Sequence, residues 1–231
     1  MTSDIFDIGL APVESRMTVA DSVYRQLRQA LILGRFDPGQ VMTIAALSQS
    51  FGTSHTPVRE ALRRLGAEGA LDSRANGSAY VPPVTRASLD DICRARIALE
   101  RLATELAAAA ITPAELDALE RLEAAHASTS HLQNVAEMLE RNRDFHFMIY
   151  RAARSDVLLP LIDSLWLRYG PFMRLLSDHM APQLALGVHE PFMAGHRAIV
   201  AALRARDPVA AGAAMESDIR GTQTLLHALA N

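Results

Sequence analysis

Residues 54–65 read SHTPVREALRRL, and this stretch decides the fold that we expect for the first third of the chain. On a helix, its apolar side chains fall on one side, at Val58, Ala61, Leu62 and Leu65. Thr56, Arg59 and Arg63 fall on a different face, about one helical turn apart. A helix in the major groove of DNA needs this layout, with an apolar back for docking and guanidinium and hydroxyl groups in front. Arginines at helical spacing are also typical of an ordinary solvated face, so the neighbouring elements must decide.

Two helices are expected before this stretch and a hairpin after it. Apolar residues recur at three- and four-residue spacings from Thr18 to Gly34, which predicts the first helix. The second is short and is expected to end at Gly52, and the third to run from Ser54 to about 69. Residues 71–83 predict two short strands joined at Asn76-Gly77, a strong hairpin signal. Three short helices followed by a hairpin is the order of a winged helix-turn-helix.

The candidate DNA contacts lie at the start of the third helix, on its polar face and at the hairpin tip. They are Ser54, His55, Thr56, Arg59, Arg63, Arg74, Asn76 and Gly77. Small residues and one cation at the tip suit a wing that lies against the DNA backbone. Residues 17–84 hold seven arginines and five acids, a balance of +2 in a chain whose net charge is −3. This local excess permits nucleic-acid binding through one face.

The character of the chain changes after Pro82-Pro83. Beyond that point we find no strand candidate, and helical patterns cover about 87–110, 113–127, 133–153, 156–178, 189–206 and 208–229. The expected fold class is therefore mainly α, a winged helix-turn-helix followed by an all-helical bundle of six or seven helices. We expect a flexible tail at 1–16, the DNA-binding domain at 17–84, and an effector-binding and dimerisation domain at 85–231.

Composition excludes several classes of protein. Cys93 is the only cysteine, so neither an internal disulfide nor a thiolate metal cluster is possible. No apolar run reaches the ~18 residues of a membrane span, and the first residues do not resemble a secretory signal. We therefore expect a cytoplasmic protein with no membrane partner. The common hydrolase, metalloprotease and phosphate-loop motifs are absent, which argues against an enzyme.

Two histidines of the second half differ from the others, because His146 and His196 each lie within or beside an apolar stripe. Taken singly, a histidine in such a place is more often a hydrogen-bonded core residue than a ligand. Asn142 precedes His146 by one turn, and Asp218 shares a side of the last helix with apolar residues, where a lone carboxylate needs a partner. These four side chains could converge on a cation or a polar ligand, but spacing alone does not show it, because the contact is tertiary.

Residues 18–83 resemble the winged helix of the GntR family. The resemblance is carried by LRQALILGRFDPG at 27–39 and by SHTPVREALRRLGAEG at 54–69. Arg59 matches the family's retained contact residue. The chain departs from the family at His55, where arginine is usual, and at Ile44-Ala45-Ala46, where an acid or arginine is common. Both missing arginines commonly touch DNA in the family, so the resemblance implies the mode of docking but not the operator sequence.

Residues from about 88 to 229 are similar to the helical FCD-type ligand-binding domain of the FadR subfamily. The matching stretches are RIALE at 96–100, NRDFH at 142–146 and HRAI at 196–199. The resemblance implies a divalent metal held by Asn142, His146, His196 and Asp218, the last at a position where the family usually has histidine. This mixed set of nitrogen and oxygen ligands suits zinc, nickel or manganese.

A metal held by two imidazoles, an amide and one carboxylate keeps residual positive charge, which favours a small carboxylate as effector. Arg96 is a candidate second anchor for it through bidentate pairing. The expected function is a transcription regulator, a repressor by the commoner logic of the family, that binds double-stranded operator DNA as a homodimer. Two alternatives stay open at this point: a metal-dependent enzyme, and a metabolite sensor that has lost DNA binding.

Overall fold

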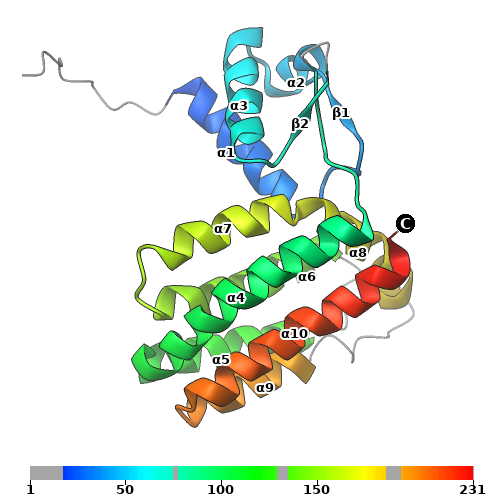
Figure 1. Cartoon of the computed structure of the whole chain (residues 1–231). Coiled ribbons are helices and arrows are strands. Elements are labelled where there is room, and N and C mark those ends of the chain that lie inside the picture. Colours follow the sequence, from blue (N-terminus) through cyan, green and yellow to red (C-terminus); the bar gives the residue numbers. More distant parts are fainter. Residues whose placement is uncertain (1–17, 75–77, 129–134, 186–193, 231) are drawn as a thin grey trace, which may run out of the picture.

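The computed structural model describes residues 18–74, 78–128, 135–185 and 194–230. Within them, a small N-terminal domain stands on one side of a larger helical domain (Figure 1). The small domain contains α1 (Val19–Ile32), β1 (Val41–Met42), α2 (Ile44–Phe51), α3 (His55–Ala67), β2 (Asp72–Ser73) and β3 (Ala79–Tyr80). The helical domain contains α4 (Arg86–Ala110), α5 (Pro113–Ser128), α6 (Val135–Ala152), α7 (Leu158–Arg168), α8 (Gly170–Ala185), α9 (Ala194–Arg204) and α10 (Pro208–Leu229). The expected class, a winged helix-turn-helix followed by an all-helical bundle, is confirmed, whereas the tail predicted at 1–16 lies outside the described residues.

Local signals set the ends of several helices. Thr18 caps α1 and forms a capping box with Asp21, each side chain bonding the other's backbone N–H. Gly52 ends α2 in the left-handed conformation, at φ 60°, which glycine adopts without strain. Asp207 caps α10 and Pro208 occupies its first turn, where the missing N–H of proline is harmless.

The wing is a three-stranded sheet rather than the predicted two-stranded hairpin. β3 lies in the middle, and both neighbours are antiparallel to it, with Asp72 opposite Tyr80 on one side and Val41 opposite Tyr80 on the other. Strand β1 was not predicted from the sequence, because a strand of two residues is too short to show any alternation. The hairpin tip at 75–77, with the candidate contacts Asn76 and Gly77, lies outside the described residues.

The helical pattern at 156–178 is two helices, α7 and α8, and not one. Pro171 has no N–H to continue the hydrogen bonds of α7, and its ring would clash with the preceding turn. Gly170 starts α8 next to the end of α1, where an ideal Cβ at this position would lie 2.1 Å from the Leu31 carbonyl oxygen. The break therefore brings the helical domain into backbone contact with the small domain.

Each domain has its own apolar core, but α7 contributes to both. Leu167 is buried among the core residues of the small domain, whereas Ile162 and Trp166 of the same helix belong to the core around α4, α6 and α10. Polar contacts reinforce this junction, since Arg28 of α1 donates to Asp163 of α7 at 2.5 Å. The junction is therefore packed as well as charged. Within the described residues, no helix combines the length and the apolar character needed to cross a membrane.

Candidate DNA-contact face and ligand pocket

The two faces predicted for α3 are separated as expected. Val58, Ala61 and Leu65 are fully buried against α1, whereas His55, Thr56, Arg59 and Arg63 are exposed together with Ser54, the residue before the helix. Arg74 is also exposed, and its guanidinium lies 5.3 Å from the ring centre of Tyr80. The structure therefore brings the described candidate contacts of α3 onto one open face.

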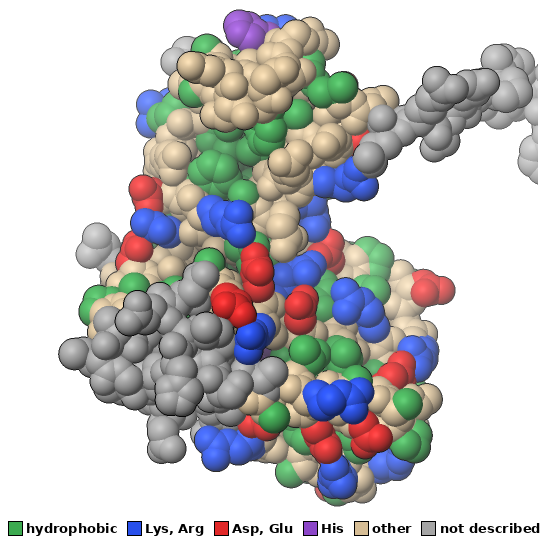
Figure 2. All heavy atoms as spheres, turned by 180° about the vertical axis from the view of Figure 1, so that it is seen from behind, with side chains coloured by type: hydrophobic (Ala, Val, Ile, Leu, Met, Phe, Trp, Pro, Cys, Tyr) green, Lys and Arg blue, Asp and Glu red, His purple; other side chains and the backbone are tan. Residues whose placement is uncertain are grey.

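The arginines of the small domain fall into two groups, those that form ion pairs within the protein and those for which no ion pair with a described residue is seen. Arg64 pairs with Asp21 at 2.7 Å and covers the Tyr24 ring, and Arg28 and Arg35 pair with Asp163 and Glu140 of the helical domain. Figure 2 shows such mixed basic and acidic side chains where the two domains meet. By contrast, no ion pair with a described residue engages Arg59 or Arg63. Arg25 and Arg74 are likewise exposed without an ion pair to a described residue, and Arg59 and Arg63 are the two such cations on the exposed face of α3.

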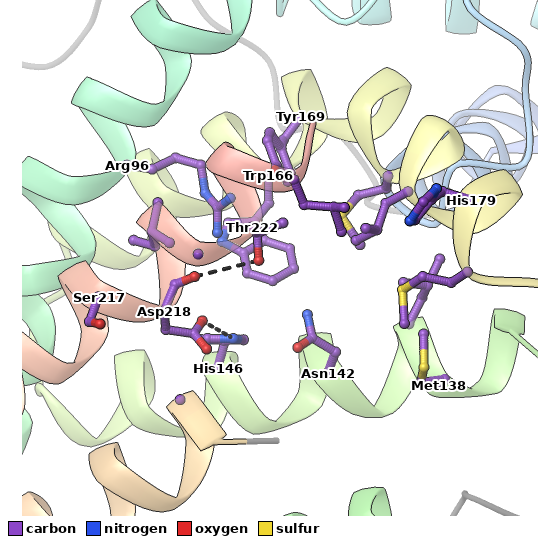
Figure 3. Close-up of a pocket in the computed structure, with 18 residues that line it drawn as sticks. Arg96, Met138, Asn142, His146, Trp166, Tyr169, His179, Ser217, Asp218 and Thr222 are labelled. Carbon is purple, nitrogen blue, oxygen red and sulfur yellow. Dashed lines mark hydrogen bonds and ion pairs between the residues drawn. The ribbon is translucent and has the colours of Figure 1, made fainter. Parts of the chain in front are cut away.

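A cavity of about 570 Å³ lies inside the helical domain, between α4, α6, α8, α9 and α10. Figure 3 shows polar side chains gathered around Asp218 and His146, with Asn142 next to them and Met138 farther along the cavity. The remaining lining includes buried apolar residues of α6 and α8, namely Leu139, Met173, Leu176 and Met180. The cavity is large enough for a drug-sized ligand.

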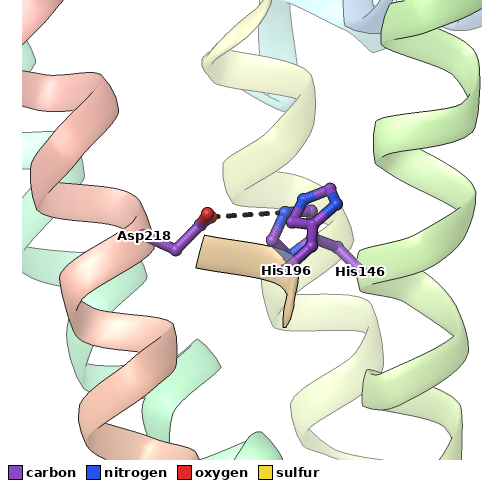
Figure 4. A group of neighbouring side chains, drawn as sticks. All are labelled: His146, His196 and Asp218. Carbon is purple, nitrogen blue, oxygen red and sulfur yellow. Dashed lines mark ion pairs between the residues drawn. The ribbon is translucent and has the colours of Figure 1, made fainter. Parts of the chain in front are cut away.

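Three of the four predicted metal ligands converge at the polar end of this cavity. His146 of α6, His196 of α9 and Asp218 of α10 each offer a ligand atom, and these atoms all lie within 4.8 Å of one another (Figure 4). The imidazole Nε2 of His146 lies 3.5 Å from Asp218 Oδ2. Asn142 lines the same cavity one turn before His146. Residues 72 positions apart in the sequence are thus neighbours, as the resemblance implies.

The surroundings hold these side chains in orientation. Phe145 stacks on the His196 ring at a centroid distance of 4.0 Å, and the Tyr150 hydroxyl lies 3.3 Å from His146 Nδ1. A hydrogen bond at Nδ1 leaves Nε2 of His146 to face the carboxylate, which is how imidazole ligands are commonly oriented. Both histidines are at least 98% buried.

The space around Asp218 and the ligand types of the cluster are suited to a cation. Gly195 leaves room for the Asp218 carboxylate, because a Cβ there would lie 2.1 Å from Oδ1. Burial raises the pKa of Asp218 to about 7, so the carboxylate is poorly solvated and a bound cation would favour its ionised form. Two imidazoles and one carboxylate are a common ligand set for zinc. The residues present therefore fit a divalent metal.

Arg96 borders the cavity, but its bidentate pairing is already made within the protein. Its Nε and Nη2 donate to the two carboxylate oxygens of Glu100 at 2.7 and 3.2 Å, and Glu100 is fully buried. Trp166 Nε1 and the Tyr150 hydroxyl also donate to Glu100. Burial lowers the pKa of Arg96, but the charge and hydrogen bonds of Glu100 together with the nearby Tyr169 and Tyr150 outweigh this effect, so the pKa lies above its ordinary value.

This buried polar cluster around Glu100 was not predicted from the sequence. The available signal was the spacing of Arg96 and Glu100, which lie one turn apart in a helix with apolar neighbours. His179 and Thr222 line the cavity but belong to no recognisable sequence pattern, so they were not predicted either.

Comparisons with known proteins agree with the families that the two halves of the chain resemble. The family model "Bacterial regulatory proteins, gntR family" matches residues 19–81, and the FCD domain model matches residues 91–221. The HTH-type transcriptional regulator McbR of Escherichia coli is 32% identical over 80% of this chain and 82% of its own length. A probable D-xylose utilization operon transcriptional repressor of Paenarthrobacter nicotinovorans is 30% identical over 84% and 82%.

Solved structures extend the similarity to the fold. The structure titled E. coli McbR/YncC superposes with a TM-score of 0.81 at 26% identity and covers 92% of this chain and 99% of that one. A putative GntR regulator from Rhodococcus reaches a TM-score of 0.75 at 18% identity and shares the fold. Domain matches and relatives alike indicate a transcription regulator and not an enzyme. The chain therefore belongs to the GntR family of bacterial regulators, in the FadR-type group whose winged helix-turn-helix is followed by an FCD domain.

Proposed function

We propose that this regulator binds double-stranded operator DNA as a homodimer and that a carboxylate metabolite, bound beside a divalent metal in the helical domain, changes its operator affinity. The observation that carries the proposal is the buried His146–His196–Asp218 cluster, which opens into a cavity of about 570 Å³ in a chain that also carries an exposed cationic helix face. Two relatives bear the name of transcriptional repressors, which favours repression relieved by the ligand.

The exposed face of α3 supports the DNA half of the proposal. Arg59 and Arg63 extend from it without an internal ion pair among the described residues. Their positive charges are therefore not neutralised by these residues and can interact with DNA phosphates or guanine edges. Ser54, His55 and Thr56 lie at its N-terminal end, where recognition helices approach base edges. We further propose that the wing contacts DNA through Arg74, Asn76 and Gly77, of which only Arg74 is among the described residues. One winged helix covers only a half-site, which is why we propose a homodimer. Because chromosomal DNA is the proposed partner, we assign the regulator to the cytoplasm.

The polar end of the cavity supports the effector half. Asn142, His146, His196 and Asp218 would hold zinc, nickel or manganese, and a bound metal supplies positive charge that attracts a carboxylate. Arg96 adds a hydrogen-bond donor at the cavity wall, although Glu100 balances its charge.

The contact between the domains provides a route from the pocket to the DNA-binding helix. Asp163 of α7 lies 2.5 Å from Arg28 of α1 and 3.6 Å from Arg143 of α6, the helix that carries Asn142 and His146. Arg28 also lies 3.6 Å from Glu68, the residue that ends α3. A shift of α6 on ligand binding would therefore alter contacts that hold both α1 and α3, a coupling of two sites through shared charges.

Operator selection followed by binding assays tests the proposal. Duplexes enriched from a random DNA library would be titrated with the full chain by fluorescence anisotropy, with and without zinc and simple carboxylates. Zinc content would be measured for His146→Ala and for the control His227→Ala, whose imidazole pairs with Asp90 on another face. We expect loss of zinc and of the carboxylate effect only in His146→Ala. No enriched duplex would favour the metabolite sensor without DNA binding, and unchanged zinc in His146→Ala would contradict the metal site.

A further inference from the structure

The cavity of the helical domain has two chemically unlike ends. At one end stand the carboxylate of Asp218, the imidazole of His146 and the amide of Asn142 (Figure 3). At the other end most of the lining is apolar and almost fully buried, namely Met138, Leu139, Met173, Leu176 and Met180. The half-buried imidazole of His179 also lies at this end (Figure 3). An apolar wall of this extent disfavours binding of a ligand that is polar along its whole length, because the ligand's polar groups would lose their hydration without gaining hydrogen bonds from the wall.

The charges around the cavity allow for one anionic group. Among the described lining residues Arg96 has the only guanidinium, and Glu100 already neutralises it through a bidentate pair with both side chains at most 5% exposed. The other concentration of ligating groups is the His146–His196–Asp218 cluster. Tyr169 and His179 also line the cavity, and the half-buried imidazole of His179 on α8 is the polar group at the methionine end (Figure 3). A second carboxylate far from the cluster would therefore meet thioethers, alkyl groups and one half-buried imidazole, without a guanidinium or a cluster of ligating groups.

From this asymmetry we infer that the effector is a monocarboxylate with an apolar body, whose carboxylate lies at the histidine end and whose body lies along the methionine wall. The inference rests on the proposed function and narrows it, since it excludes dicarboxylates and sugar acids. Methionine side chains are unbranched and polarizable, so the wall adapts to an alkyl chain or to a ring.

The energetic consequence is a dependence of affinity on chain length. Each methylene moved from water to an apolar wall strengthens binding about fourfold, until the cavity is filled. A hydroxyl or a second carboxylate placed against the thioethers and alkyl groups loses its hydration and gains no hydrogen-bond partner from them.

Isothermal titration of the full chain, with and without zinc, would test this with acids of defined structure. Hexanoate, adipate and gluconate share six carbons but differ in a second carboxylate or in hydroxyls. We expect hexanoate to bind at least tenfold more tightly than adipate or gluconate. In the series acetate, butyrate, hexanoate, the dissociation constant should fall about fourfold per methylene. These comparisons need only the unmodified protein.

Two matched variants locate the body of the ligand. Met138→Gln places a polar group in the apolar wall, whereas Met148→Gln makes the same change on the same helix outside the cavity lining. Met138→Gln should weaken hexanoate severalfold and leave acetate unchanged, and Met148→Gln should leave both unchanged.

Adipate or gluconate binding as tightly as hexanoate, or equal affinity for acetate and hexanoate, would overturn the inference and leave regulation by a carboxylate intact. Absence of binding by every acid, in zinc and without it, would overturn the inference together with the effector class of the proposed function. An equal loss of hexanoate affinity in Met138→Gln and Met148→Gln would place the ligand body elsewhere and overturn the inference as well.

Discussion

Replacing Glu100 with glutamine removes one negative charge from the middle of the helical domain at almost unchanged volume. Glu100 is fully buried and accepts hydrogen bonds from Arg96, Trp166 and Tyr150. In Glu100→Gln the buried Arg96 guanidinium keeps its charge but loses its counter-charge. Moreover, the amide nitrogen of the glutamine has to face donors instead of accepting from them.

The size of the effect follows from the burial of the pair. Removing one partner of a buried ion pair costs about 3–5 kcal/mol, because the other charge stays desolvated and unpaired. For a domain of this size, 1 kcal/mol changes the melting temperature by about 2–4 °C. We therefore expect the helical domain of Glu100→Gln to melt about 10 °C lower than that of the unmodified chain.

Thermal unfolding followed by circular dichroism at 222 nm, in EDTA so that bound metal adds no stability, measures this difference. The matched control is Glu105→Gln on the same helix, which removes a charge paired with Arg101 at 2.9 Å but 29% exposed. An exposed pair contributes at most about 1 kcal/mol, so the control should melt within a few degrees of the parent. Equal melting temperatures for the two variants would refute the reasoning.

Three other perturbations have expected outcomes. The double variant Arg59→Ala/Arg63→Ala should weaken operator binding and reduce the slope of log affinity against log salt concentration by about two, because each arginine is expected to neutralise one phosphate. Fluorescence anisotropy at several salt concentrations measures this slope. Cys93 is fully buried and burial raises its pKa to about 11, so the folded chain at pH 8 should resist Ellman's reagent, which should modify it completely in urea. Gly170→Ala should loosen the domain contact and destabilise the chain by about 1–3 kcal/mol, because the alanine Cβ would lie 2.1 Å from the Leu31 carbonyl oxygen. Limited proteolysis between the domains measures the loosening.

The two substitution experiments each have a matched control variant. Arg154→Ala removes an arginine paired with Glu115 in the helical domain, so the salt slope should not change. Gly221→Ala adds a Cβ with no atom within 4 Å and should leave the domain contact intact. A fast reaction of Cys93 in the folded chain would contradict its burial, and unchanged protease resistance in Gly170→Ala would contradict the close approach.

Much of the fold was predictable because it depends on signals within a few residues. The apolar stripe of α3, the stop at Gly52 and the start at Pro208 are properties of single turns, and all three are as expected. The pairing of β1 with β3 and the division of residues 156–178 at Tyr169 were not predicted. A two-residue strand has no periodicity, and Pro171 alone does not tell a kink from a new helix.

The candidate site was predictable only in part. The sequence by itself determined which residue types lie on which helix face, and the resemblance named Asn142, His146, His196 and Asp218 as ligands. Only the tertiary structure decided that three of these meet, that Glu100 takes the bidentate pairing of Arg96, and that Arg59 and Arg63 carry no internal ion pair among the described residues. The physical reason is range: helical periodicity is a local property of the backbone, whereas a charge is neutralised by whichever residue the packing of distant helices brings within a few ångströms of it.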